Sequence, residues 1–544
     1  MLRTIFRTWL AIPSNRALLI IVSLACIAHL GVRMYTIADR GFDFDEAATW
    51  SLTRSLKDVV PLAVTDCHPP LYWILQTLWT GLFGTSEAAF RSLSTAFSLL
   101  LLLLLAMCIR DAQASNNSWA ILASACVFSL LPYDIYFSRD ARNYTMLVFL
   151  CSLFSYLFFR VVVSGEQRWF PYAALVGISA IYTHNLALMS IAAAAVAGVL
   201  SSPTRANLYV VAKLGLILAV GWIPWAVVMP IQMIHSMAAV RIFKQYSIWS
   251  LTEVPAGKLL ALLNPHPSSL DSPDYGLLYD GIIAMPDDWL GWLGLSLAVL
   301  AVCIILINLG NIVRNVSIRP FFFQVVILSF FMALSPVAVF SQKAPYLFVF
   351  PAVLLLGYSF SELMRTKAKL LSIAFLVSFV AVSLGGFPYS NRGTDWKSLC
   401  GAVSQAWEKA QTPALLISPA NEVLTLQYYI SRGYCKCFNP VWMSLNLVVT
   451  VIPPFDKELK LNMLTEGNRL EWSLDETALA SIMETVQRTE PATTDIFYIR
   501  EGSGNLNLEW LNKEIGAWTT SRSRFGLMAL YHLERKKSQA SASK

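Results

Sequence analysis

Residues Ala17–Tyr35 (ALLIIVSLACIAHLGVRMY) form a long apolar run, and the acidic stretch Gly41–Ala47 (GFDFDEA) follows it closely. Such a run is long enough to cross a bilayer, which takes about 20 predominantly apolar residues in a helix. It is also longer than the roughly 7–15 apolar residues of a secretory signal. Because Arg3, Arg7 and Arg16 precede it, we interpret it as an uncleaved first span with a cytoplasmic N-terminus.

The composition of the whole chain is that of a membrane protein. Hydrophobic residues make up 56% of the 544 residues and charged residues only 14%, and the mean hydropathy is +0.55. A soluble chain carries about 25% charged residues. The formal net charge of +7 lies largely in short loops between apolar runs, so it does not indicate a nucleic-acid-binding protein.

Eleven apolar segments are predicted to span the membrane. They lie near residues 17–36, 88–109, 118–137, 144–163, 169–184, 186–202, 207–229, 289–309, 320–341, 345–361 and 369–387. With this count, Arg and Lys gather in the loops predicted to be cytoplasmic, as the positive-inside rule requires. The predicted fold class is therefore mainly α, with a polytopic catalytic domain over residues 1–387.

Three predicted outer segments are too long to be simple connections. In residues 37–87, the apolar stretch Pro69–Gly84 predicts a helix lying in the membrane interface; a short true span is the alternative, which the charge pattern disfavours. Residues 230–288 form the second segment. The odd number of spans places residues 388–544 outside, where a soluble α/β domain is expected.

Local sequence in the C-terminal region supports this interpretation. Ala414–Ser418, Asp495–Arg500 and Gly526–Leu533 are predicted strands. Four cysteines also fall in the predicted outer segments, where a disulfide bond is permitted. They are Cys67, Cys400, Cys435 and Cys437.

The acidic stretch concentrates carboxylates beside the first span. Asp43, Asp45 and Glu46 lie within four residues, and any of them could act as a general base toward an acceptor hydroxyl. A helix-capping role for Asp43 or Asp45 is the structural alternative. Asp45 and Glu46 also offer hard oxygen ligands for a divalent cation such as Mg²⁺ or Mn²⁺, although nothing in the sequence demands one.

Cationic residues recur at the outer ends of the predicted spans. Arg139 and Arg142 follow the third span, against the positive-inside trend, so an anionic partner should compensate them. A phosphate would do so through bidentate guanidinium contacts. Ion pairs with Asp134 and Asp140 are the alternative.

Two histidines and a lysine lie on the same predicted side. His68 precedes Pro69-Pro70, which starts a helix, and helix N-termini suit anionic groups. His184 and Lys343 occupy further outer turns. Together these cations could bind the phosphate of a polyprenyl-phosphate sugar and stabilise the leaving group. No glycine-rich phosphate loop is present, consistent with a lipid-linked rather than a nucleotide donor.

In these residues the chain resembles the GT-C glycosyltransferase superfamily, in particular protein O-mannosyltransferases, the lipid A aminoarabinose transferase and bacterial polyprenyl-phosphate-sugar transferases. The matching motifs are, in order, Asp45-Glu46, His68–Tyr72, Gly84 and Glu87, Arg91–Ser94, Ser138–Arg142 with Tyr144, and Tyr182–His184.

The resemblance implies particular roles for these residues. It makes Asp45 the catalytic base, with Glu46 beside it, and places His68 near the sugar or phosphate. Arg139 and Arg142 would line the donor pocket. Two departures leave questions open, since Lys343 stands where relatives commonly have arginine or tyrosine, and the extra Asp43 competes for the role of base.

The sequence thus predicts a glycosyltransferase that moves a single sugar from a polyprenyl-phosphate donor to a hydroxyl of a cell-envelope acceptor. The acceptor would be a glycolipid such as lipopolysaccharide, a polysaccharide or a protein. The expected site is the periplasmic face of a bacterial inner membrane, among membrane lipids, with inversion at the anomeric carbon. A lipid-linked oligosaccharide ligase or a lipid or sugar transporter are the alternatives.

Overall fold

The structure is a computed structural model, and its residues fall into two compact units. It describes residues 13–65, 68–112, 117–230, 232, 260, 262–265, 289–334, 344–385, 395–409, 413–418, 422–434, 449–450, 460–461, 495–501, 518–525 and 528–535. Unit 1 comprises Met1–Ile37 and Leu52–Tyr389, and unit 2 comprises Ala38–Ser51 and Ser390–Lys544. The predicted outer segment 230–288 lies almost wholly outside the described residues.

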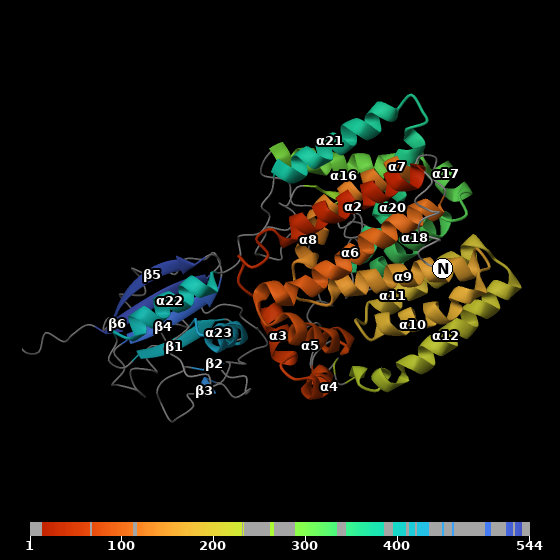
Figure 1. Cartoon of the computed structure of the whole chain (residues 1–544). Coiled ribbons are helices and arrows are strands. Elements are labelled where there is room, and N and C mark those ends of the chain that lie inside the picture. The colour runs from red at the N-terminus through yellow and green to blue at the C-terminus, as the bar shows by residue number, and fades with distance from the viewer. Residues whose placement is uncertain are drawn as a thin grey trace, which may run out of the picture. The chain divides into compact units, whose positions relative to one another are not determined.

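Unit 1 is helical in its described part (Figure 1). Its helices are α2 (Pro13–Met34), α4 (Leu56–Thr65), α5 (Leu71–Phe83), α6 (Glu87–Asp111), α7 (Asn117–Leu130), α8 (Pro132–Ser138), α9 (Tyr144–Val162), α10 (Phe170–Ile181), α11 (Ala187–Ser201), α12 (Arg205–Ala226), α16 (Trp289–Ile307), α17 (Leu309–Arg314), α18 (Arg319–Leu334), α20 (Val349–Leu363) and α21 (Lys369–Gly385). The described part of this unit also contains the 3-10 turns η1 (Gln167–Trp169) and η4 (Ala344–Phe348).

Each of the eleven predicted spans falls on a described helix or helix pair. Among the described residues, five helices are long and apolar enough to cross a membrane, and a bent pair makes up to six. Four shorter apolar helices accompany them: Leu18–Met34, Ala187–Ser201, Arg319–Met332 and Lys369–Gly385. The chain is therefore mostly helical and a multi-pass membrane protein, while the exact number of spans stays a prediction.

The third predicted span differs from the expectation of one straight helix. It consists of α7 and α8, which are bent by 62° at the break between them. Leu131 at the break is extended, with φ −69° and ψ 116°, and Pro132 begins α8. The physical cause is the proline ring, which disfavours helical backbone in the residue before it and removes an N–H from the helix.

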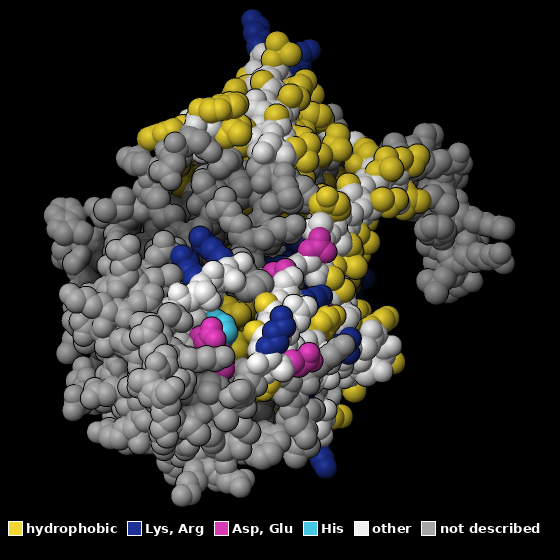
Figure 2. All heavy atoms as spheres, turned by 90° about the vertical axis from the view of Figure 1, so that its left-hand side faces the viewer, with side chains coloured by type: hydrophobic (Ala, Val, Ile, Leu, Met, Phe, Trp, Pro, Cys, Tyr) yellow, Lys and Arg dark blue, Asp and Glu magenta, His cyan; other side chains and the backbone are white. Residues whose placement is uncertain are grey.

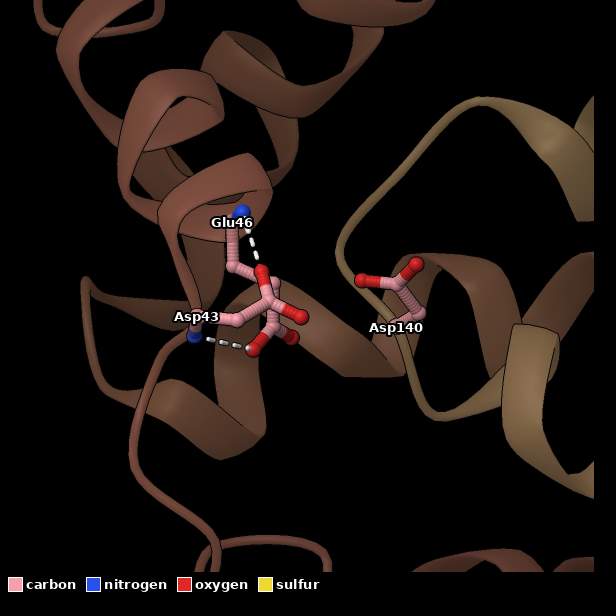
Figure 3. Close-up of side chains that lie close together, drawn as sticks. All are labelled: Asp43, Glu46 and Asp140. Carbon is pink, nitrogen blue, oxygen red and sulfur yellow. Dashed lines mark hydrogen bonds between the residues drawn. The ribbon is translucent and has the colours of Figure 1, made fainter. Parts of the chain in front are cut away.

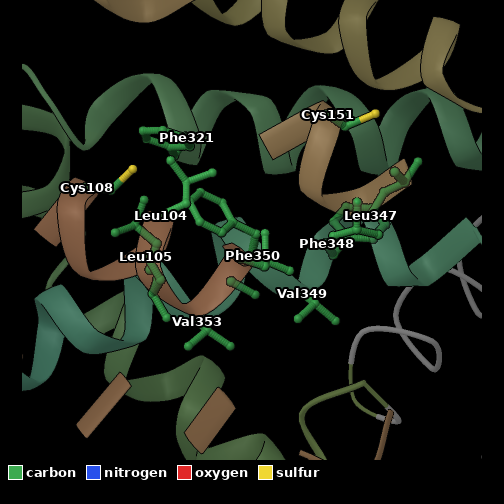
Figure 4. Close-up of a cluster of buried hydrophobic side chains, with 14 of the residues drawn as sticks. Leu104, Leu105, Cys108, Cys151, Phe321, Leu347, Phe348, Val349, Phe350 and Val353 are labelled. Carbon is green, nitrogen blue, oxygen red and sulfur yellow. The ribbon is translucent and has the colours of Figure 1, made fainter. Parts of the chain in front are cut away.

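Helix α20 forms the centre of unit 1. It contacts α6, α7, α16 and α18, and the segment Tyr346–Leu363 is 94% buried. Figure 4 shows part of this core, where Phe350 and Val353 of α20 lie with Leu104 and Leu105 of α6. Burial of this kind, rather than polar contact with solvent, fixes how the helices pack.

Gly357 allows α20 to approach α7 closely. A Cβ at this position would lie 1.7 Å from the Ser124 hydroxyl oxygen and 3.3 Å from the Ala120 carbonyl oxygen. Small residues at such contacts are typical of membrane helices, where close backbone approach contributes much of the packing. The glycine is therefore required by the α7–α20 contact.

The outward faces of several helices remain apolar. Leu216, Val220 and Ile223 of α12 and Leu370 and Val377 of α21 are all exposed. Figure 2 shows hydrophobic side chains predominating toward the top, where Figure 1 places α21 and α16. A surface of this kind is suited to contact with lipid acyl chains.

Unit 2 contains a mixed sheet with the strand order β1-β4-β6-β5. The strands are β1 (Pro413–Ser418), β4 (Asp495–Glu501), β5 (Trp518–Phe525) and β6 (Met528–Arg535), and β2 (Val449–Thr450) pairs separately with β3 (Lys460–Leu461). β1 is parallel to β4, with Pro413 opposite Asp495, whereas β6 is antiparallel to both β4 and β5. The predicted segments Ala414–Ser418 and Asp495–Arg500 are strands, and the third, Gly526–Leu533, is a strand from Met528 onward, its first two residues lying outside the described part.

The described residues of unit 2 include three helices. They are α22 (Trp396–Trp407), α23 (Glu422–Ser431) and α3 (Phe44–Leu52), of which α3 carries the acidic stretch. By its contacts the acidic stretch therefore groups with the C-terminal region, although most of the chain lies between them. The predicted domain boundary at residue 387 took no account of this grouping.

Candidate active site

The acidic stretch forms the N-terminus of α3. The Asp43 carboxylate accepts the backbone N–H of Glu46 at 2.9 Å, and the Glu46 carboxylate accepts the backbone N–H of Asp43 at 3.3 Å (Figure 3). This reciprocal pair has the geometry of a capping box, in which two otherwise unsatisfied backbone donors gain partners. The helix-capping alternative is thus correct for Asp43, and Asp45 takes no part in the pair.

The charges of this stretch are unevenly exposed. The Glu46 side chain is fully buried and lies 3.2 Å from the Arg40 guanidinium, whereas the Asp43 side chain is 43% exposed and 4.0 Å from it. Burial raises the pKa of the Asp43 carboxyl, and the negative charge of Glu46 raises this pKa further, against the opposing effect of Arg40. Arg40 therefore neutralises only part of the acidic charge.

The predicted cation site involves the same carboxylates. Glu46 Oε2 both accepts the Asp43 N–H and lies against Arg40. A divalent ion bound by Glu46 and Asp45 would compete with that guanidinium for the Glu46 oxygens. The residues supply suitable oxygen ligands, but they fit the ion only if Arg40 shifts.

The predicted donor residues Arg139 and Arg142 lie in the turn between α8 and α9 in unit 1, where both are buried. Arg139 donates to the carbonyl of Thr36 at 2.9 Å and to its hydroxyl at 3.1 Å. Thr36 has a φ of +54°, which is uncommon for a β-branched residue. The carbonyl of Arg142 accepts the Ser94 hydroxyl at 3.1 Å. Hydrogen bonds to Thr36 and from Ser94 therefore anchor the turn that carries the two arginines.

A cluster of rings adjoins this turn in unit 1. The rings of His68 and His184 are 4.4 Å apart between centroids, and that of Tyr144 lies 6.3 Å from His68 and 5.8 Å from His184. Tyr144 is the first residue of α9, just after Arg142 and Asn143. The structure thus brings together three predicted donor residues that are distant in sequence.

Backbone contacts fix the same cluster. The N–H of Leu71, at the start of α5, donates to the carbonyl of Tyr182 at 3.0 Å, and the Asn143 amide donates to the carbonyl of Thr183 at 3.0 Å. His184 Nδ1 accepts the N–H of Leu186 at 3.0 Å. Because Nδ1 is an acceptor, the ring proton of neutral His184 is on Nε2.

A second polar group lies inside unit 1 and was not predicted. Arg33 of α2 forms an ion pair with Asp134 of α8, and both side chains are fully buried. Ser98 donates to the Asp134 carboxylate at 2.7 Å, and the Tyr346 hydroxyl donates to its other oxygen. The sequence also allowed an ion pair between Asp134 and Arg139 or Arg142. That alternative is wrong for Asp134, because its partner is Arg33.

His29 extends this buried group. Its ring nitrogens lie 3.1 Å from the Ser129 hydroxyl and 2.9 Å from the Ser98 hydroxyl. Arg33 also donates to the carbonyl of Ser129 at 3.0 Å. Ionisable residues inside an apolar run were the available signal, since they are costly in a membrane and are usually paired. Lys343, by contrast, lies outside the described residues.

Comparisons with known proteins identify the fold. No protein-family model and no curated protein sequence matches the chain. ArnT from Cupriavidus metallidurans bound to undecaprenyl phosphate is similar, with a TM-score of 0.52 at 12% identity, covering 94% of this chain and 97% of that chain. Apo ArnT gives 0.50 at 14% identity with the same coverage.

These proteins are membrane glycosyltransferases of the GT-C superfamily. The chain has the GT-C fold. An Archaeoglobus fulgidus oligosaccharyltransferase in complex with Zn and sulfate is also similar, with a TM-score of 0.41 at 12% identity over 77% of this chain. This chain covers 57% of that longer protein. The likeness to the two ArnT structures agrees with the fold expected from the motifs, and it concerns the fold alone.

Within this GT-C fold, the predicted residues divide between the two units. Unit 1 contributes His68, Arg139, Arg142, Tyr144 and His184, and unit 2 contributes Asp43, Asp45 and Glu46. Unit 1 therefore carries the cations suited to a phosphate, and unit 2 carries the carboxylates suited to a base.

Proposed function

We propose that this protein is a glycosyltransferase that moves a single sugar from a polyprenyl-phosphate donor to a hydroxyl of a cell-envelope acceptor. The observation that carries the proposal is the pair of buried arginines, Arg139 and Arg142, directly preceding the Tyr144 ring cluster. Guanidinium groups in a water-poor site suit a phosphate monoanion or dianion. The undecaprenyl phosphate named for the similar ArnT structure supports this choice of donor.

In the proposed reaction, the acceptor oxygen forms a bond to the anomeric carbon while the bond from that carbon to the phosphate oxygen breaks. The polyprenyl phosphate leaves with the bonding electron pair, and Arg139, Arg142 and His68 stabilise its charge. Tyr144, His184 and Lys343 complete the proposed donor site. A single displacement by the acceptor inverts the anomeric configuration.

Asp45 is the proposed base that takes the acceptor proton. Asp43 and Glu46 support α3 through their reciprocal hydrogen bonds, and Arg40 lies against Glu46. Asp45 is in the first turn of the same helix and outside that pair. The resemblance of the Asp45-Glu46 motif supports Asp45 as the base, with Glu46 and Asp43 as supporting carboxylates.

A divalent cation is not part of any proposed step. If Mg²⁺ or Mn²⁺ binds Asp45 and Glu46, it would add positive charge for the acceptor or the phosphate. The guanidinium of Arg40 already supplies positive charge at Glu46.

We also propose that unit 2 faces the periplasm of a bacterial inner membrane. Cys400, at the start of unit 2's helix α22, is disulfide-bonded. Disulfide bonds persist in oxidising compartments such as the periplasm and are rare in the cytosol. An outer location also fits the predicted cytoplasmic N-terminus and an envelope glycolipid, polysaccharide or protein as acceptor.

The test uses purified protein in nanodiscs with a panel of polyprenyl-phosphate sugars and follows release of free polyprenyl phosphate. Loss of a general base typically lowers the rate about 10²–10⁴-fold, so Asp45→Asn should lose activity by that factor. Asp395→Asn, the same change at the N-cap of α22, is the matched control, and Asp43→Asn tests the neighbouring carboxylate while keeping a residue that caps helices.

The outcomes separate the alternatives. Donor turnover that survives in Asp45→Asn but not in Asp43→Asn would move the base to Asp43. Turnover only with a lipid-linked oligosaccharide would identify a ligase. Movement of lipid or sugar across the bilayer without cleavage of the donor would identify a transporter and overturn the proposal.

A further inference from the structure

The acidic stretch is held by the C-terminal part of its own unit. Residues Ala38–Ser51 and Ser390–Lys544 form one compact unit, so contacts between them are internal to it. The backbone N–H of Phe42 donates to the Tyr429 hydroxyl of α23 at 2.9 Å. Phe42 is 1% exposed and Tyr429 is fully buried. This bond meets the chain one residue before Asp43, where α3 is capped.

Aromatic packing reinforces this contact along α3. The Phe42 ring lies 4.3 Å from that of Tyr428, and the Trp50 ring meets Tyr428 edge-on at 5.6 Å. Phe42 precedes α3 and Trp50 lies near its end, so one tyrosine contacts residues at both ends of the helix. Edge-to-face and offset rings are favourable arrangements for aromatic pairs.

Tyr429 also packs against helix α22 of the same unit. The Trp396 ring of α22 stacks on Tyr429 with an interplanar angle of 11° and a centroid distance of 6.1 Å. Trp396 is 1% exposed, and the Asp395 carboxylate caps α22 by accepting the N–H of Ser398 at 3.0 Å. The Tyr429 ring that carries the hydroxyl is therefore buried and packed against α22.

We propose that Tyr429 is a positioning residue for the acidic stretch. Its hydroxyl fixes the backbone at Phe42, which sets the start of α3 and so the direction in which Asp45 is presented. The catalytic consequence rests on the proposed function, whereas the anchoring does not. A displacement of about 1 Å in a reacting group can cost roughly 100-fold in rate. A small shift of the backbone at Phe42 would therefore move Asp45 and lower the rate.

Two measurements on full-length protein in nanodiscs test this role. Tyr429→Phe keeps the ring and removes the hydroxyl; Tyr434→Phe, the same change at a neighbouring tyrosine that is 39% exposed, is the matched control. Hydrogen–deuterium exchange of the peptide covering residues 40–50 should be about tenfold faster in Tyr429→Phe, because a hydrogen-bonded amide loses its acceptor. The control should exchange like the wild type.

Kinetics then separate positioning from mere stability. In Tyr429→Phe, kcat for donor turnover should fall about tenfold, while the donor KM stays unchanged because the proposed donor residues lie in unit 1. A proportional loss of folded protein would lower the active fraction but leave kcat per folded molecule unchanged, and that result would overturn the proposal.

The exchange measurement also stands alone. If the wild type turns over no donor, the proposed function fails, yet faster exchange confined to residues 40–50 still supports the anchoring. Unchanged exchange in Tyr429→Phe overturns the anchoring whatever the activity shows. Faster exchange with unchanged kcat shows an anchor that does not position the base, and it also overturns the proposal.

Discussion

The buried ion pair in unit 1 and the Asp43 carboxylate in unit 2 differ in how far their charges are exposed to solvent. Arg33 and Asp134 are fully enclosed, and Ser98 and Tyr346 also donate to the Asp134 carboxylate. Asp43, in contrast, is 43% exposed and has a raised pKa. An enclosed charge is tolerated only when its partners satisfy it, whereas a partly exposed carboxylate with a raised pKa is suited to proton transfer.

This difference in exposure separates polar residues that stabilise the fold from polar residues that could act on a substrate. The Arg33 group joins α2, α6, α8 and η4 through the ion pair and through hydrogen bonds from Ser98 and Tyr346 to the Asp134 carboxylate. The acidic stretch is anchored through the backbone N–H of Phe42, and the Asp43 side chain beside it is 43% exposed. The following predictions probe this contrast.

The largest expected effect is at the enclosed pair. Asp134→Ala leaves the Arg33 guanidinium buried without its carboxylate, so we expect a loss of roughly 3–5 kcal/mol in the free energy of unfolding. Unfolding in mixed micelles measures it. The double variant Arg33→Met with Asp134→Leu removes both charges and should recover most of this loss. A double variant no more stable than Asp134→Ala would show that the charges themselves stabilise the fold.

The arginine turn should affect donor use rather than folding. Arg139→Ala and Arg142→Ala each remove charge-assisted hydrogen bonds to the proposed phosphate, so the donor KM should rise about ten- to a hundredfold. Arg365→Ala is the control, because that side chain is 66% exposed and lies 3.9 Å from Glu362. Full activity of both variants would remove these arginines from the donor site.

A substitution that adds volume but no charge in unit 1 should also lower the free energy of unfolding. Gly357→Ala places a methyl group against Ser124 and the Ala120 carbonyl, which should cost roughly 1–3 kcal/mol by overpacking. Gly310→Ala in α17 is the matched control, since nothing lies within 4 Å of the added carbon. Equal stability of the two variants would show that α7 and α20 separate easily.

The smallest expected effect is the pH dependence of the cap at Asp43. Its pKa is raised by burial and by Glu46, so its contribution to stability is full below about pH 4 and falls as the pH rises through the raised pKa. Asp43→Asn keeps the cap without the charge. It should match the wild type near pH 3.5 and melt at a higher temperature near pH 7.

The matched control is Asp395→Asn, the same change at the N-cap of α22. Melting curves at both pH values provide the comparison. An Asp43→Asn variant that melts below the wild type near pH 7 would mean that the ionised cap stabilises α3, contrary to the direction of the Asp43 pKa.

Much of the helical architecture could be predicted from hydrophobicity. The positions of apolar runs depend on local composition, and each predicted span falls on a helix or helix pair. The bend before α8 could also have been anticipated, because Pro132 acts on the residue directly before it. The strand segments at residues 414–418 and 495–500 are likewise local signals that the sheet retains.

The candidate site was only partly predictable. The sequence indicated Arg139, Arg142, His68 and His184 as separate polar positions, but the ring contact between the histidines depends on how α5 and the turn after α10 pack. The partner of Asp134 was missed because Arg33 lies in another helix. An ion pair between two segments that are far apart in the chain produces no sequence pattern within either segment.

The sequence by itself determined that this chain is a multi-pass helical membrane protein, since the bilayer demands long apolar runs with internally bonded backbone. It also determined the local cap of α3, because Asp43 and Glu46 are three residues apart. Only the tertiary structure decided that Arg33 meets Asp134 and that Tyr429 holds Phe42. The physical reason is that such contacts arise from packing between segments far apart along the chain, which local propensity does not specify.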